Sequence, residues 1–194
     1  MAVDYDCTYG NVSTTEARDL AFGTPYAFEP HEAGCTEPWV TNLVVALMCS
    51  IKAERILETG AFKGYTTKAL AGRMAPSATL DYCEIDPERL NVLLEGVSGI
   101  PGVFGHGDVL DLLVRRPDNF YDFVFLDDDH SEAHVRNELA MVYRKVRPGG
   151  LIVLHDVTGA CAYIGGMVRG YGGIALDLPR LGPAGGLGII QKPL

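Results

Sequence analysis

One acid and two glycines stand close together in the segment Arg55–Thr67, which reads as a short apolar strand, a turn and the start of a helix. Backbone N–H groups at such a helix start point toward a ligand. The spacing is E-x-G-x-x-x-G, formed by Glu58, Gly60 and Gly64, whereas folds that bind a dinucleotide use G-x-G-x-x-G. Glu58 stands at the strand end, where its carboxylate repels phosphate and attracts a cation. The motif therefore favours a cationic ligand without phosphate groups over NAD or a flavin.

Acids also follow the other predicted parallel strands. In an open α/β sheet, ligands bind outside the carboxyl ends of the strands, so side chains at these positions share one crevice. Five acids at one edge are more than solvation alone explains. They are Glu58, Glu84, Asp108, Asp127 and Asp156.

Two of these acids have a structural alternative. Glu84 lies 24 residues beyond Gly60, where an acid can accept hydrogen bonds from both hydroxyls of a ribose. A helix N-terminal acid is its alternative role, although Asp86, just before a proline, suits that role better. Asp108 can hold an adenine amino group or cap the helix that follows it, and the sequence leaves both open.

Strand and helix patterns alternate along the chain, which predicts a parallel sheet covered by helices on both faces. Thr36 is expected to cap the first helix, with Pro38 in its first turn. The last two strands have no helix between them and should pair as a hairpin. The expected strands are Arg55–Glu58, Thr79–Ile85, Val103–His106, Tyr121–Asp127, Leu151–His155, Ile174–Leu178 and Leu187–Gln191; the expected helices after the first are Tyr65–Met74, Pro87–Val97, Leu110–Arg115, Glu132–Val146 and Thr158–Arg169.

The fold class is thus α/β, a doubly wound Rossmann-like sheet of about seven strands with an antiparallel C-terminal strand. Residues 1–35 are rich in Gly, Pro, Thr and Glu with aromatic residues between them, and we interpret them as an N-terminal arm. The arm is either a lid that shapes a ligand pocket or a strap packed on the first helix. Residues 36–194 form one domain.

The composition of the chain disfavours several classes of function. The formal net charge of −9 disfavours a surface that follows nucleic-acid phosphates. No apolar run reaches the ~18 residues of a membrane span, and the N-terminus lacks the pattern of a signal peptide. Five cysteines without metal spacing favour a reducing compartment. We expect a cytoplasmic protein that binds neither nucleic acid nor membrane, and the sequence leaves a homo-oligomer open.

The segments Y-D-F-V-F-L-D-D-D-H at 121–130 and R-P-G-G-L-I-V-L-H-D at 147–156, together with the glycine motif, resemble a known family. They look like class I S-adenosylmethionine-dependent methyltransferases of the small-molecule O-methyltransferase type, related to the catechol and caffeoyl-CoA enzymes and to the branch that acts on sugars and antibiotics. The resemblance covers Thr36–Gln191. It implies methyl transfer from S-adenosylmethionine to a hydroxyl of a small molecule.

The resemblance assigns the cofactor to the glycine turn and the strand ends. Glu58, Gly60, Gly64, Glu84, Asp108 and Asp127 would contact it. Phe62, Tyr65 and Thr66 would surround its methionine part, although Tyr65 can equally pack on the sheet.

The resemblance also implies a metal site and a base. In the family, the acids after strands four and five hold a divalent cation, here Asp127 and Asp156, with Mg²⁺ or Mn²⁺ as the candidates. Val157 replaces the asparagine of catechol-type relatives, so His155 becomes the third ligand; metal-free catalysis is the alternative. His130 falls where those relatives place a catalytic lysine and would take the hydroxyl proton, with Asp127 beside it.

Purely structural roles stay open for two histidines. His130 can be a helix-entry residue, and His134 is expected on the helix surface. Two other functions also stay open. One is an S-adenosylmethionine-binding protein without methyl transfer, and the other is a nicotinamide-dependent oxidoreductase. A nucleic-acid methyltransferase is disfavoured by the net charge.

Overall fold

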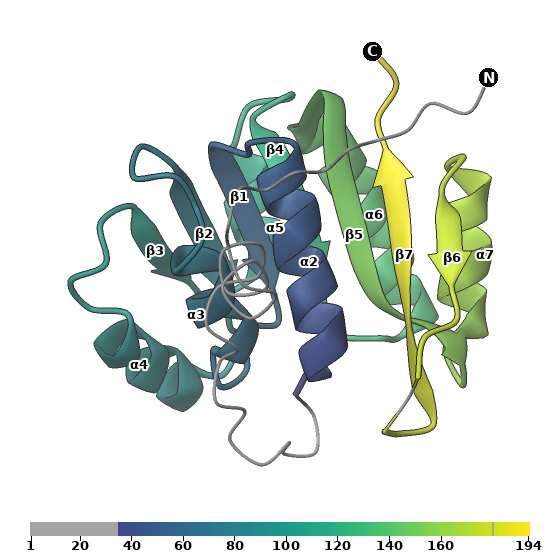
Figure 1. Ribbon diagram of the computed structural model, residues 1–194, viewed down its shortest axis with the longest axis horizontal. Helices are drawn as coiled ribbons and strands as arrows, with labels where there is room; N and C mark the ends of the chain where they lie inside the picture. Colours follow the sequence, from purple (N-terminus) through teal and green to yellow (C-terminus); the bar gives the residue numbers. More distant parts are fainter. Residues whose placement is uncertain (1–34, 180) are drawn as a thin grey trace, which may run out of the picture. The chain divides into compact units, whose positions relative to one another are not determined.

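The computed structural model describes residues 35–179 and 181–194, so nearly all of the predicted arm lies outside the described residues. Seven strands form one sheet in the order β3-β2-β1-β4-β5-β7-β6 (Figure 1). The strands are β1 (Arg55–Thr59), β2 (Thr79–Cys83), β3 (Val103–His106), β4 (Tyr121–Leu126), β5 (Val146–Gly159), β6 (Ile174–Leu176) and β7 (Ala184–Gln191). The helices are α2 (Pro38–Ser50), α3 (Tyr65–Ala71), α4 (Pro87–Gly96), α5 (Val109–Arg115), α6 (Glu132–Lys145) and α7 (Ala162–Gly170).

Pairing within the sheet confirms the predicted fold class. Strands β1 to β5 pair with one another in parallel, and the pairing of β1 with β4 places the ends of these two strands side by side. Strand β7 is antiparallel to both β5 and β6. The last two strands therefore form the expected hairpin, with β7 inserted between β5 and β6.

Two local expectations were wrong. The N-cap of α2 is Glu37, without a side-chain capping bond, and Thr36 instead donates its hydroxyl to a carboxylate of the site. The helix expected from Thr158 begins at Ala162, because β5 continues to Gly159. Thr158 and Gly159 pair with β7, and this strand pairing outweighs their weak helix propensity.

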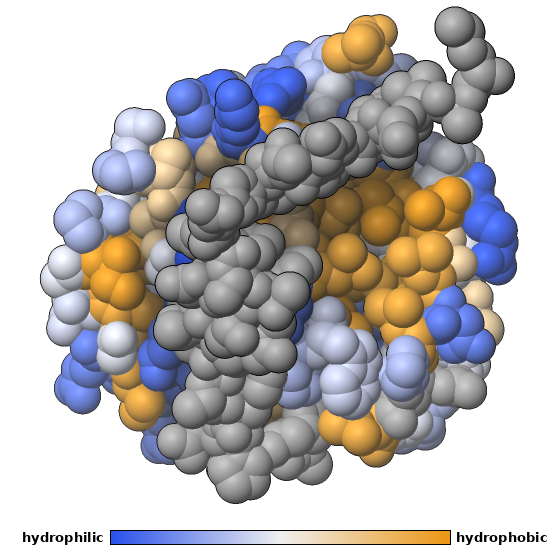
Figure 2. Space-filling model, in the orientation of Figure 1, coloured by the Kyte–Doolittle hydropathy of each residue, from blue (hydrophilic) through white to orange (hydrophobic). Residues whose placement is uncertain are grey.

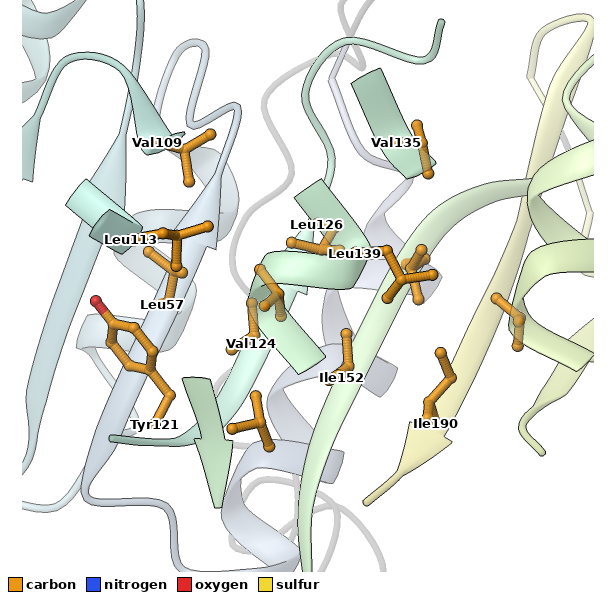
Figure 3. Packing of buried hydrophobic residues seen from close by; sticks show 14 of the residues in the cluster. Leu57, Val109, Leu113, Tyr121, Val124, Leu126, Val135, Leu139, Ile152 and Ile190 are labelled. Carbon is orange, nitrogen blue, oxygen red and sulfur yellow. The ribbon is translucent and has the colours of Figure 1, made fainter. Parts of the chain in front are cut away.

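Buried apolar residues form a layer on each face of the sheet. On one face α5, α6 and α7 pack over Leu57, Val124, Ile152 and Ile190 (Figure 3). On the other, α2 and α3 pack over residues of β1, β4 and β5, and apolar side chains remain visible beside α2 (Figure 2). Strands buried on both faces leave only their ends for chemistry.

Candidate active site

The glycine turn after β1 has a backbone that only glycine fits. Gly60 has φ of +70°, and a Cβ there would lie 2.1 Å from the backbone oxygen of Asp127. Gly64 has φ of +75°, and its Cβ would lie 2.1 Å from a methyl of Leu93. The first glycine therefore lets the turn touch the end of β4, and the second lets α3 start against α4.

Glu84 holds this turn in place from the end of β2. Its two carboxylate oxygens accept hydrogen bonds from the backbone N–H of Phe62, at 2.8 Å, and of Asp86, at 2.9 Å. Asp86 caps α4 by accepting from the N–H groups of Glu88 and Arg89. The alternative helix-terminal role thus belongs to Asp86, and Glu84 lies buried against the glycine turn.

Glu58 lies at the end of β1 and is 2% exposed. Burial raises the pKa of its carboxyl to about 8, and the nearby Asp127 carboxylate adds to the shift. Its Oε2 has no hydrogen-bond partner among the described residues. Glu58 is therefore a buried acid whose proton a cationic ligand could replace.

The other predicted cofactor residues have mixed environments. Asp108 accepts from the N–H of Leu110 and caps α5, as its structural alternative expected. Tyr65 is 40% exposed, so it does not pack into the sheet. Thr66 is buried, and its hydroxyl lies 3.4 Å from that of Thr36. Thr66 is thereby linked to the cluster at the end of β4.

A buried ion-pair chain joins α2 to the strand ends. Glu37 Oε2 lies 2.8 Å from His155 Nε2, and Asp127 Oδ1 lies 2.9 Å from His155 Nδ1. The flanking carboxylates raise the pKa of His155 to about 10, although burial opposes this. Burial alone would raise the pKa of Glu37, but its hydrogen bond and ion pair with His155 lower it. His155 is therefore a cation held between two acids.

His130 lies between two carboxylates at the mouth of this cluster. Its Nε2 is 3.6 Å from Asp127 Oδ1 and 3.4 Å from Asp156 Oδ2. Asp156 takes a left-handed backbone with φ of +55°, which is uncommon for a residue other than glycine. The hydroxyl of Tyr163 donates to the backbone oxygen of His130. The ring of His130 is partly exposed, so a ligand can reach it.

The structure thus brings two groups of predicted residues together. Asp127, His130, His155 and Asp156 form one cluster, and Glu84 contacts the turn that carries Phe62. Sequence reasoning missed Glu37, which stands 118 positions from His155 and precedes a helix rather than ending a strand. It also missed the bond from Thr36 to Asp127, at 2.6 Å.

The predicted metal ligands are engaged with other side chains. Both ring nitrogens of His155 face carboxylates, at 2.8 and 2.9 Å. The His130 ring lies between Asp127 and Asp156. One ligand atom from each of Asp127, His130 and His155 lies within 4.8 Å of the others, so the donors that converge at this edge include His130 and not Asp156.

The fold and the strand-end acids are those of a methyltransferase, and the chain belongs to the family described as methyltransferase domain, whose model matches residues 57–157. A relative from Mycobacterium sp. (strain JLS), named "Putative O-methyltransferase", is 27% identical over 128 residues, which are 63% of this chain and 57% of that protein. The chain thus matches a little over half the length of its curated relatives.

Solved structures share the fold. The O-methyltransferase TomG of Streptomyces achromogenes, involved in tomaymycin synthesis and solved with S-adenosylmethionine, superposes with a TM-score of 0.67 at 20% identity, over 82% of each chain. An O-methyltransferase from Bacillus cereus, solved with S-adenosylhomocysteine, has a TM-score of 0.64 at 21% identity, over 83% of this chain and 84% of that one. Within the described residues, no helix is long and apolar enough to cross a membrane.

Proposed function

We propose that this chain transfers a methyl group from S-adenosylmethionine to a hydroxyl of a small molecule. The observation that carries the proposal is the position of His130, whose Nε2 lies within 3.6 Å of Asp127 and 3.4 Å of Asp156 at the strand ends. The turn held by Glu84 stands at the same sheet edge, where the fold places ligands. Membership of the methyltransferase family supports the same reading.

In this proposal the cofactor lies over the glycine turn. Each oxygen of Glu84 already accepts one backbone N–H and keeps a lone pair, so the carboxylate can also accept two ribose hydroxyls. Glu58 would attract the positive end of the cofactor, which offsets the cost of its buried charge. The remaining cofactor residues are proposed on the resemblance alone: Gly60, Phe62, Gly64, Tyr65, Thr66, Asp108 and Asp127.

S-adenosylmethionine supplies an electrophilic methyl group on a sulfonium. The acceptor oxygen attacks that carbon as the carbon–sulfur bond breaks, and Nε2 of His130 takes the hydroxyl proton. Asp127 and Asp156 then stabilise the imidazolium that forms, since both carboxylates face the ring. Thr36 and His155 hold Asp127 in place through bonds of 2.6 and 2.9 Å.

A divalent cation bound by Asp127, His155 and Asp156 stays a prediction. We route no step through it, because both ring nitrogens of His155 already contact carboxylates, of Glu37 and Asp127. Activity measured after chelation, and again with added Mg²⁺ or Mn²⁺, tests it. Loss of activity on chelation that added Mg²⁺ restores would show that activity needs a cation, and the same assay on Glu138→Gln would separate a cation at the acceptor from one at another site.

The cofactor is tested by calorimetry on the full chain with S-adenosylhomocysteine and with NAD. We expect S-adenosylhomocysteine to bind and to raise the melting temperature. Glu84→Ala should weaken binding by about 1.5–3 kcal/mol, roughly 10- to 150-fold in Kd. Asp86→Ala is the matched control, because it also removes an acceptor beside the turn but leaves the ribose site intact. Tighter binding of NAD would overturn the proposal.

The transfer itself is tested with a panel of hydroxylated small molecules and mass detection of the methylated product. Binding of S-adenosylhomocysteine without methylation of any catechol, sugar or phenolic hydroxyl would favour a binding protein without transfer. A small hydroxylated acceptor is expected, with no role for nucleic acid. The oligomeric state is open, and a homo-oligomer would be detected by light scattering in the same samples.

A further inference from the structure

A second cluster of metal-ligating side chains lies between the end of β4 and α6, and the function proposed above does not use it. It consists of Asp128, His134 and Glu138. His134 Nε2 lies 2.9 Å from Asp128 Oδ2 and 3.9 Å from Glu138 Oε2. His134 was expected on the helix surface; it is partly exposed, and its ring also contacts these two acids.

Glu138 occupies a position that packing alone would give to an apolar residue. It stands three and four residues from Val135 and Val142 on the buried face of α6, and is 1% exposed. Its Oε1 has no hydrogen-bond partner among the described residues. A cavity of about 10 Å³ lies beside Glu138 and Asp128. A buried carboxylate oxygen without a partner is costly, so the site calls for a further group.

One distance in the cluster matches that between adjacent ligands of a divalent ion, and the contact of His134 with Glu138, at 3.9 Å, is longer. Ligand atoms about 2.1 Å from a cation stand about 3.0 Å apart when adjacent in an octahedron and about 3.4 Å apart in a tetrahedron. Here one ligand atom from each of the three side chains lies within 4.8 Å of the others, and the closest pair is at 2.9 Å. Small side-chain rotations would bring the three donors around one ion.

Charge points the same way. Two carboxylates meet one imidazole here, with Glu138 buried and Asp128 and His134 partly buried, so a divalent cation would balance the negative charge of the acids.

We propose that Asp128, His134 and Glu138 form a structural site for a borderline divalent cation such as Zn²⁺ or Mn²⁺. One imidazole and two carboxylates are a donor set suited to these ions rather than to Ca²⁺. Glu138 supplies both oxygens, which gives Oε1 its partner. The ion ties the end of β4 to α6 and so holds the loop that carries His130. This site is separate from the acids that face the acceptor.

The test measures metal binding by the full chain, freed of metal by a chelator and without cofactor. Equilibrium dialysis against Zn²⁺ and against Mn²⁺, with bound metal counted by mass spectrometry, should find one ion per chain at this site. Glu138→Gln, which keeps the size of the side chain, and His134→Ala should each weaken that binding at least tenfold. Asp129→Asn, an exposed acid in the same loop, should bind as the wild type does.

Two further readouts keep the outcome decisive. Thermal melts of metal-free Glu138→Gln should show a folded protein, and added metal should raise the melting temperature of the wild type only. Asp156→Asn removes an acid of the neighbouring cluster, so it should leave the ion bound. The proposal is overturned if the wild type binds no ion, if Glu138→Gln and His134→Ala bind it unchanged, or if Asp156→Asn alone abolishes binding.

Discussion

The pair of Glu37 and His155 offers the sharpest test of the site's electrostatics. We expect Glu37→Gln to lower the free energy of unfolding at pH 6 by about 1.5–3 kcal/mol, the usual worth of a hydrogen bond to a charged group. Glutamine keeps an acceptor for Nε2, at 2.8 Å in the wild type, but loses the negative charge. Glu37→Ala also loses the acceptor and should cost about 3–5 kcal/mol, as for a broken buried pair.

The effect should depend on pH in a definite direction. The pKa of His155 is raised to about 10 from 6.5, so its contribution to stability is complete below pH 6.5 and is lost as the pH rises through 10. The pKa of Glu37 is lowered, so its contribution is present above about 4.5 and is lost in acid. The cost of Glu37→Gln should therefore be largest near pH 5–6.5 and should vanish or change sign near pH 10.5.

Urea unfolding at fixed ionic strength measures this cost at each pH. The matched control is Glu132→Gln, which removes an exposed ion pair with Arg136 and should change stability by under about 0.5 kcal/mol at any pH. An equal cost of Glu37→Gln at pH 6 and pH 10.5 would mean that His155 carries no charge in the folded protein. The reasoning about the ion-pair chain would then fail.

Three further predictions follow from the turn and the base. Gly60→Ala should destabilise the fold by at least about 2 kcal/mol in urea unfolding, because φ is +70° and the new Cβ would meet the oxygen of Asp127, whereas Gly166→Ala, in open space on α7, should not destabilise it. His130→Ala should lower methyl transfer by about 10²–10⁴-fold while calorimetry shows unchanged S-adenosylhomocysteine binding; wild-type turnover in the variant would move the base elsewhere. In the wild type, buried Glu58 keeps its proton up to about pH 8, so the free energy of unfolding should fall as the pH rises from 4.5 to 8. Glu58→Gln should reduce this fall, because glutamine does not titrate. An unchanged pH profile would show that Glu58 is ionised in the fold.

The sequence pattern was sufficient to predict the sheet, because strands buried on both faces are largely apolar. Strand β4, with every residue buried, is an example. The first and last residues of helices and strands were harder to predict, because tertiary contacts determine where each helix or strand ends. Threonine often caps helices, but the hydroxyl of Thr36 donates instead to the charged carboxylate of Asp127, at 2.6 Å.

The candidate site was predictable where topology alone brings residues together. Asp127 follows β4, and Asp156 lies in β5 just beyond Leu154, the last residue that pairs with β4, so their proximity follows from the sheet. Glu37 was not predictable, because its approach to His155 depends on how α2 packs across the sheet. The pair His134 and Glu138 did leave a signal, since residues four apart share one face of a helix and Asp128 stands two residues after strand β4.

Placement of β7 has a consequence for how the chain is made. During translation β5 emerges from the ribosome first and β6 second. Strand β7, which lies between them in the sheet, emerges last. Until β7 emerges, β6 lacks its sheet neighbour and the edge of β5 stays open to other chains. Proteins built in this order are exposed to aggregation late in synthesis, when β1 to β5 have already been translated. Slow translation or mutation within residues 184–191 should therefore lower the soluble yield more than the same change in β3 at the opposite edge.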